Sequence, residues 1–312
     1  MNKENPVYSV IVPMFNEQDA IHETITRLKS VMDSMDEPYE LIFIDDGSKD
    51  FTRRTVKSHM RIGCSMQLIS FSRNFGHQAA VTAGLDYANG EAIIIIDADL
   101  QDPPEVIPNM AYLWKQGFEV VYGKRKKRAG ESWFKEFSAK CFYRLLQSIA
   151  DIDIPVDTGD FRLIDRKVCN VIRAMDERNR YVRGLIAWVG FKQTAYEYDR
   201  DARFAGETKY PFRKMLRLAL DGITGFSYKP LRIAGWLGGV LSVSSLVALI
   251  ISLGRWIFVD SVISWVLALT LILFSQGLVL LGLGIAGEYI GRLFDEAKKR
   301  PVYIVREEIS NS

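Results

Sequence analysis

Two long stretches without a charged residue constrain the fold of this chain most. Residues 233–253 and 262–287 hold 21 and 26 residues without Asp, Glu, Lys or Arg, and the short segment between them contains Arg255 and Asp260. About 20 apolar residues are enough to cross a lipid bilayer as a helix. We therefore predict two transmembrane helices joined by a short loop. The alternative is a helical hairpin buried in a globular protein, which the length of both stretches disfavours.

Basic residues around the two stretches predict how the chain sits in the membrane. The positive-inside rule places Lys-rich and Arg-rich flanks in the cytoplasm, so we expect both termini and the whole domain before the first stretch on the cytoplasmic side of the plasma or inner membrane. Glycines in both stretches allow close helix packing, which is compatible with a homo-oligomer. The basic residues are Lys209, Arg213, Lys214, Arg217, Lys229 and Arg232 before the first stretch, and Arg292, Lys298, Lys299 and Arg300 after the second.

The remaining composition excludes several classes of protein. The formal net charge of the 312 residues is only +2, which gives no reason to expect nucleic-acid binding. Cys64, Cys141 and Cys169 are far apart and form no C-x-x-C pair, so neither a disulfide framework nor a zinc site is expected. They are typical of a reducing compartment. The N-terminus shows no apolar segment of a signal peptide.

The part of the chain before residue 200 alternates between strand-like and helix-like patterns. Short links join them, which predicts a doubly wound, largely parallel α/β sheet. The segment 194–198 is expected to be an edge strand. The strand-like runs before it are residues 8–13, 40–44, 66–71, 93–96 and 118–123.

Carboxylates follow the most buried of these predicted strands. Residues 93–96 are four isoleucines, typical of a strand covered on both faces. Asp97, Asp99 and Gln101 come directly after them. Ligands bind beyond the carboxyl ends of parallel strands, and two carboxylates with an amide oxygen suit Mg²⁺. The alternative for this segment is a solvated acidic turn before a helix.

Two other predicted strands end in polar residues at the same edge. These are Asn16 and Glu17 after the first strand, and Asp45 and Asp46 after the second. Each pair alone could be a turn or a helix cap, but three such clusters at one edge indicate a nucleotide pocket. The chain lacks both the dinucleotide fingerprint G-x-G-x-x-G and a P-loop. Phosphates would therefore be held by a metal and by cationic side chains.

Basic and amphipathic segments follow the predicted sheet. Residues 124–128 are five consecutive basic residues, which form either a solvated face or a patch for phosphates or an anionic membrane. An amphipathic helix over 133–146 is either a core helix or an interfacial one. Residues 199–209 are polar and contain Gly206, so we predict a mobile loop there.

Together the motifs resemble those of glycosyltransferase family 2, and more narrowly the polyprenyl-phosphate glycosyltransferases. That group includes the dolichol-phosphate mannose synthases and the bactoprenol glucosyltransferases. The resemblance covers nearly the whole chain. The motifs are Pro13-x-Phe15-Asn16-Glu17, Asp45-Asp46-Gly47-Ser48-x-Asp50, Arg73-Asn74-x-Gly76, Asp97-Ala98-Asp99-Leu100-Gln101-Asp102-Pro103-Pro104 and Gly206-Glu207-Thr208-Lys209-Tyr210.

This resemblance implies a GT-A fold, a nucleotide-sugar donor, a Mg²⁺ or Mn²⁺ cofactor and a polyprenyl-phosphate acceptor. By position, it implies a nucleoside pocket lined by Pro13, Phe15, Glu17, Ile44, Asp46 and Asp97. It implies a metal held by Asp97, Asp99 and Gln101, and an acceptor phosphate held by Arg125 and, more loosely, Lys135. Arg203 and Lys209 are expected to close over the diphosphate. Asp160, with Asp157 behind it, is a catalytic candidate expected to position a substrate more than to abstract a proton.

The expected organisation has four parts. Residues 1–208 form the GT-A domain, 209–230 a basic interfacial helix, 231–290 the transmembrane hairpin and 291–312 a cytoplasmic tail. The expected reaction is the inverting transfer of one sugar, with UDP-glucose favoured over UDP-N-acetylglucosamine, GDP-mannose and UDP-aminoarabinose. A processive polysaccharide synthase is disfavoured because residues 180–183 lack the Q-x-x-R-W motif and two spans are too few for a polymer channel. A non-catalytic nucleotide-binding scaffold is a third hypothesis.

Overall fold

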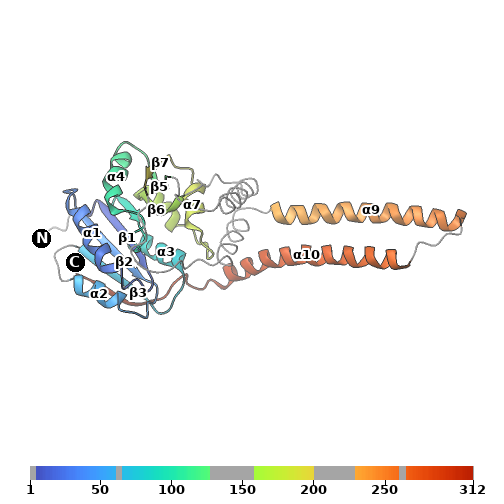
Figure 1. The fold of residues 1–312 in the computed structure, drawn as a ribbon, viewed down its shortest axis with the longest axis horizontal. Helices are drawn as coiled ribbons and strands as arrows, with labels where there is room; N and C mark the ends of the chain where they lie inside the picture. The colour runs from blue at the N-terminus through green and yellow to red at the C-terminus, as the bar shows by residue number, and fades with distance from the viewer. Residues whose placement is uncertain (1–4, 61–64, 127–157, 200–228, 260–264, 312) are drawn as a thin grey trace.

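The computed structural model describes residues 5–60, 65–126, 158–199, 229–259 and 265–311. They form an α/β body from which two long helices project side by side (Figure 1). The chain returns from the second long helix to the body, where its last strand lies.

The body is built on one eight-stranded sheet in the order β7-β5-β6-β4-β1-β2-β3-β8. The neighbours β4, β1, β2 and β3 are parallel, and so are β5 and β7. The strand β6 is antiparallel to β4 and β5, and β8 is antiparallel to β3. The prediction of a largely parallel sheet with an edge strand near 194–198 is confirmed. The strands are β1 (Tyr8–Met14), β2 (Tyr39–Asp45), β3 (Ser65–Phe71), β4 (Ala92–Ile95), β5 (Val120–Arg125), β6 (Thr158–Asp165), β7 (Gln193–Tyr198) and β8 (Val305–Ser310).

Helices cover both faces of the sheet, which explains the continuous apolar strands. On one face Ile94 and Ile96 pack in a cluster with residues of α1, α2 and α4, and on the other Ile93 and Ile95 pack with residues of α3, α6 and α7. All four isoleucines are buried. The helices are α1 (Ile21–Asp33), α2 (Thr52–His59), α3 (His77–Tyr87), the 3₁₀ turn η1 (Pro104–Val106), α4 (Ile107–Lys115), α6 (Arg166–Arg173) and α7 (Val182–Trp188).

The order of the strands reverses at β1, which makes a topological switch point at one edge of the sheet. The chain runs from β1 to β2 and β3 on one side, and then crosses to β4 on the other side of β1. Such a switch point is where open α/β sheets bind ligands, beyond the carboxyl ends of the strands. Because β6 is antiparallel to β4, with Arg162 opposite Ile95, its first residues lie at this same edge.

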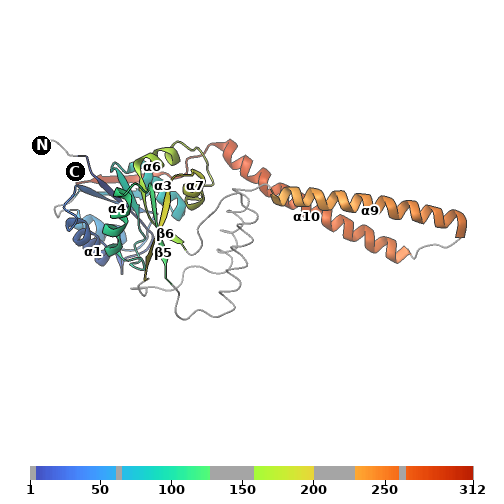
Figure 2. The same cartoon turned by 90° about the horizontal axis from the view of Figure 1, so that it is seen from above.

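The two projecting helices are α9 (Lys229–Val259) and α10 (Trp265–Lys298). Each contains a window long and apolar enough to cross a membrane, Leu231–Ala248 and Phe274–Lys298, and neither window is buried against the protein. The helices contact each other, since a Cβ placed on Gly282 would lie 3.9 Å from the Cβ of Ala234. Figure 2 shows them crossing outside the body.

The structure differs from the expected tail at residues 291–312. The helix α10 continues to Lys298, and β8 then joins the sheet as an antiparallel partner of β3. An ion pair of 2.8 Å joins Glu307 Oε1 to Lys57 Nζ, and Tyr303 stacks on Phe71 at 5.1 Å between ring centroids. Because β8 is an edge strand, only part of its surface is buried, and it can carry charged residues. These charged residues make the strand difficult to predict from the sequence.

Candidate active site

The carboxyl end of β4 carries the predicted metal ligands. Asp97 follows the strand, and its side chain is 33% exposed. The backbone N–H of Gln101 donates to Asp99 Oδ1 over 3.1 Å, which folds these residues into a tight turn. Thr24 of α1 donates its hydroxyl to the carbonyl of Ala98 over 2.8 Å. A hydrogen bond within the turn and one from α1 therefore fix the backbone of the segment that follows β4.

The end of β1 lies beside the end of β2, as the sequence predicts. Asp46 donates its backbone N–H to the carbonyl of Met14 over 3.0 Å. The Asn16 N–H donates to Ser48 Oγ over 3.0 Å, and Glu17 donates its N–H to Thr52 Oγ1 over 2.8 Å. The three polar strand ends therefore converge on one edge. Pro13 is buried within β1, and Phe15 is half-buried after it.

The carboxylate of Asp46 is used inside the fold. It accepts the backbone N–H groups of Phe75 and Gly76 over 2.7 and 3.0 Å. Burial raises the pKa of Asp46, and these hydrogen bonds oppose that rise. A Cβ on Gly47, whose φ is +75°, would lie 2.6 Å from the carbonyl carbon of Arg73, so only glycine allows this approach. The side chain of Ile44 lies in the core beneath α3.

Asp160, at the start of β6, is held by two cationic side chains. Arg183 of α7 donates to Oδ1 through Nε over 2.5 Å and to Oδ2 through Nη2 over 2.9 Å. His77, the first residue of α3, places Nε2 at 3.0 Å from Asp160 Oδ2 and at 3.8 Å from Asp97 Oδ1. His77 therefore links the ends of β4 and β6.

The environments of Asp97 and Asp160 shift the pKa values of these two carboxylates in opposite directions. Burial raises the pKa of Asp97 to about 6, although the charge of His77 opposes the rise. Burial also acts to raise the pKa of Asp160, but Arg183 and His77 outweigh it and hold that pKa well below its usual range. Burial acts to lower the pKa of His77, but the hydrogen bond to Asp160 and the charge of Asp97 raise it to about 9. Asp160 is therefore a poor proton acceptor.

Arg125, at the end of β5, lies near Asp160 in a second charged group. Its Nη2 is 3.3 Å from Asp102 Oδ2 and 3.4 Å from Asp102 Oδ1. The hydroxyl of Tyr198 donates to Asp102 Oδ1. A Cβ on Gly159 would lie 2.7 Å from Arg125 Nη2, so the guanidinium packs against the backbone next to Asp160.

Four predicted site residues, Lys135, Asp157, Arg203 and Lys209, lie outside the described residues. Conversely, His77, Arg183, Asp102 and Tyr198 belong to the site although the sequence did not assign them. His77 directly follows the Arg73–Gly76 motif, and Asp102 lies within the motif that contains Asp97. Arg183 and Tyr198 have no local signal, because their partners are distant in the sequence.

The residues at the end of β4 fit a divalent cation that is shared with a substrate. No group of three or more His, Cys, Asp or Glu side chains within the described part of the chain is placed to hold a metal. Mg²⁺ commonly takes one or two protein carboxylates and completes its shell with substrate phosphates and water. Asp97 and Asp99 offer such oxygen donors, and the raised pKa of Asp97 is the shift expected of a partly desolvated carboxylate with too little compensating positive charge.

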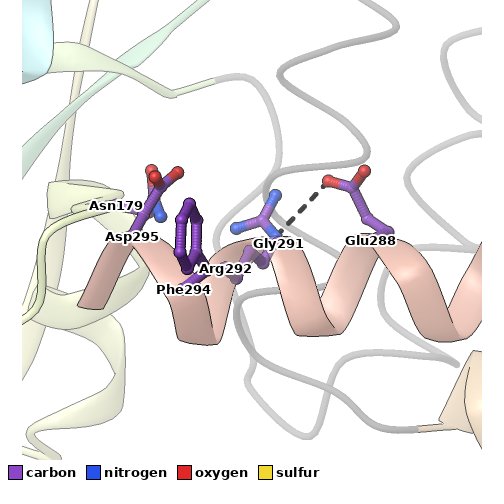
Figure 3. Close-up of a pocket in the computed structure, with 6 residues that line it drawn as sticks. All are labelled: Asn179, Glu288, Gly291, Arg292, Phe294 and Asp295. Atoms are coloured by element: carbon purple, nitrogen blue, oxygen red, sulfur yellow. Dashed lines mark ion pairs between the residues drawn. The ribbon is translucent and has the colours of Figure 1, made fainter. Parts of the chain in front are cut away.

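A separate pocket of about 330 Å³ lies where α10 meets the loop before α7 (Figure 3). Its charges are partly paired, since Arg292 Nε lies 3.6 Å from Glu288 Oε1. None of the predicted site residues within the described ranges lines it. Its lining residues are Asn179, Glu288, Gly291, Arg292, Phe294 and Asp295.

The model of the family described as "Glycosyl transferase family 2" matches residues 9–173, which include the ends of β1, β2, β4 and β5 and Asp160. The chain belongs to glycosyltransferase family 2. It is therefore a glycosyltransferase, and its sheet is the GT-A-like sheet that the resemblance implied.

Relatives within the family match almost the whole chain. An uncharacterized glycosyltransferase, YkcC, of Bacillus subtilis is 56% identical over 96% of this chain and 93% of its own length. The prophage bactoprenol glucosyl transferase homolog of Escherichia coli K12 is 41% identical over 96% and 98%. The bactoprenol glucosyl transferase of Shigella phage SfV is 39% identical over 96% and 98%.

Among solved structures, one match is glucosyl-3-phosphoglycerate synthase of Mycobacterium tuberculosis in complex with Mn²⁺, UDP-glucose and phosphoglyceric acid. It is 18% identical, covers 70% of this chain and 78% of that chain, and has a TM-score of 0.46.

Proposed function

We propose that this glycosyltransferase transfers a single glucosyl residue from UDP-glucose to a polyprenyl phosphate at the cytoplasmic face of a membrane. The observation that carries the proposal is that acidic and cationic groups meet at one sheet edge of a body that bears two membrane-length helices. The bactoprenol glucosyl transferases that match over nearly their full length support both the glucosyl donor and the lipid acceptor.

The donor is expected at the switch point between β1 and β4. Asn16, Glu17 and the end of β2 would border the nucleoside, and Asp97, Asp99 and Gln101 would face the diphosphate. A divalent cation held by Asp97 and Asp99 would supply charge compensation to the departing nucleoside diphosphate. Hydrogen bonds within the loops at this edge fix the backbone of the residues proposed to bind the nucleotide sugar, before that substrate binds.

The acceptor needs no strong general base. The second pKa of a phosphate monoester is near 6, so a polyprenyl phosphate is largely dianionic at neutral pH. One of its oxygens would attack the anomeric carbon directly as the nucleoside diphosphate leaves, which inverts the configuration. Bringing two anionic groups together is the main electrostatic obstacle, and Arg125 is placed to offset the acceptor charge.

Asp160 has a positioning task in this scheme. Because Arg183 and His77 hold its pKa well below the usual range, it remains a carboxylate that accepts hydrogen bonds. We assign it to orienting a sugar hydroxyl close to the β4 end. Lys135, Arg203 and Lys209 remain proposed phosphate-binding residues.

The test is a transfer assay with the full chain in membranes. Radiolabelled UDP-glucose, undecaprenyl phosphate and Mg²⁺ should place label in the organic extract as a lipid with one hexose. A parallel panel of UDP-N-acetylglucosamine, GDP-mannose and UDP-aminoarabinose, with mass spectrometry of the lipid, identifies the donor. Absence of lipid product with every donor would exclude the proposal. Products with more than one sugar would favour the processive synthase.

A further inference from the structure

Arg125 alone could bind a phosphate, but its guanidinium also contacts Asp102, which in turn accepts a hydrogen bond from Tyr198. These three residues form a cluster. The side chain of Asp102 is 1% exposed, whereas that of Arg125 is 14% exposed. The carboxylate is thus enclosed, and the Arg125 side chain is the more accessible of the two. Tyr198 is also buried and donates its hydroxyl to the same carboxylate.

The tyrosine ring itself is fixed by packing. Phe161 contacts it edge-on, with ring centroids 5.8 Å apart and an interplanar angle of 87°. A Cβ on Gly123 would lie 2.8 Å from Tyr198 Cε1, so the ring lies directly against the β5 backbone. The hydroxyl therefore has a defined direction, and it fixes the Asp102 carboxylate in turn.

Stability alone is a weak reason for such a cluster. A buried ion pair commonly gains little net stability, because desolvation offsets the attraction between the charges. Among the described contacts, Arg125 donates to Asp102 through Nη2, and Arg125 Nε is buried without a hydrogen-bond partner. The cluster therefore orients the guanidinium without using all five of its N–H donors.

We propose that Asp102 and Tyr198 are positioning residues that orient the Arg125 guanidinium for the phosphate of the lipid acceptor. The proposal rests on the proposed function, in which Arg125 binds that phosphate. Asp102 fixes one end of the guanidinium, Tyr198 fixes Asp102, and Gly159 leaves room for the guanidinium beside Asp160. The acceptor phosphate is thereby directed toward the sugar.

The first test is Tyr198→Phe, which removes one hydroxyl and keeps the ring contact with Phe161. Initial rates are measured with the full chain in detergent, at saturating UDP-glucose and varied undecaprenyl phosphate. We expect the acceptor KM to rise roughly tenfold, the size expected when a hydrogen bond to a charged group is lost. The donor KM should remain within about twofold of wild type. The matched control is Tyr196→Phe on the same strand, a half-buried tyrosine outside the cluster.

The second test shows whether Tyr198 acts through Arg125. Arg125→Lys is measured alone and combined with Tyr198→Phe. If the tyrosine acts by orienting the guanidinium, its substitution adds little to the acceptor KM in the lysine background. Asp102→Asn retains the shape of the carboxylate, and its acceptor KM should rise while thermal unfolding shows that the protein is folded.

The outcomes separate this inference from the function on which it rests. If the wild type transfers sugar to undecaprenyl phosphate but Tyr198→Phe leaves the acceptor KM unchanged, the positioning role is wrong. A lower kcat or melting temperature with an unchanged acceptor KM indicates a merely structural role and also overturns it. Full additivity with Arg125→Lys does the same. If the wild type transfers to no polyprenyl phosphate, the proposed function fails and the inference fails with it.

Discussion

Asp97 and Asp160 lie at neighbouring strand ends and both approach His77, yet their environments differ in charge. Asp160 has Arg183 and His77 within hydrogen-bonding distance, whereas Asp97 has His77 at 3.8 Å. The pKa of Asp160 is accordingly lowered, and that of Asp97 is raised to about 6. The difference indicates that the β6 side is complete within the protein, whereas the β4 side is arranged for additional positive charge.

The largest expected effect follows from removing a carboxylate on the β4 side. Asp99→Asn should lower the transfer rate by about 100-fold or more, because charge stabilisation by a metal contributes several kcal/mol to the transition state. The rate is measured by label in the organic extract over a Mg²⁺ series. Asp36→Asn is a matched control, since Asp36 is exposed, and asparagine tolerates its φ of 55°. Equal rates for Asp99→Asn and wild type would place the metal elsewhere.

A second variant tests whether the β6 side is internally compensated. Arg183→Gln leaves the Asp160 carboxylate buried without its main partner, which should cost about 3–5 kcal/mol of unfolding free energy. The double variant Asp160→Asn with Arg183→Gln removes both charges. We expect it to recover most of the stability in thermal unfolding but to regain no transfer activity. Recovery of activity together with stability would show that the pair is only structural.

His77 connects the two sides, and its substitution should affect them differently. Its pKa of about 9 makes it a cation beside Asp97 at neutral pH, so it opposes metal binding there. His77→Gln should lower the Mg²⁺ concentration for half-maximal activity by about fivefold, the equivalent of about 1 kcal/mol of repulsion. The maximal rate should fall several-fold, because Asp160 loses a hydrogen bond. An increased Mg²⁺ requirement would contradict the repulsion.

The smallest effect is expected for an ion pair exposed to solvent. The side chains of Lys57 and Glu307 are 36% and 39% exposed, so water screens their attraction. Glu307→Gln should therefore change the unfolding free energy by less than about 1 kcal/mol. Transfer activity should not change. If Glu307→Gln lost as much unfolding free energy as Arg183→Gln in the same thermal unfolding measurement, burial would not explain the difference between the two ion pairs.

Local patterns predicted most of the sheet and the acidic strand ends. The four isoleucines at 93–96 indicated a strand buried on both faces, and Asp97 and Asp99 followed from their position after it. Such features depend on neighbours in the sequence, and the periodicity of a strand determines which side chains are buried.

The charged partners of the site could not be predicted in the same way. Arg183 is 23 residues from Asp160, and Tyr198 is 96 residues from Asp102. Their contacts exist only because β6 runs antiparallel to β4 and because β7 pairs with β5. The strand β8 was not predicted for a related reason. Its charged residues interrupt the apolar pattern typical of a strand, and its pairing with β3 depends on the rest of the sheet.

The pairing of β8 with β3 also has a consequence for biosynthesis. The strand β3 (Ser65–Phe71) has no antiparallel partner until β8 is synthesised, which happens only after both apolar helices. The ion pair between Lys57 and Glu307, 250 residues apart, illustrates this distance in sequence. Contacts so distant in sequence form late, and an unpaired strand edge is a site of aggregation. The catalytic sheet is therefore completed only after both apolar helices have left the ribosome, which couples maturation of the enzyme to delivery of its hydrophobic hairpin.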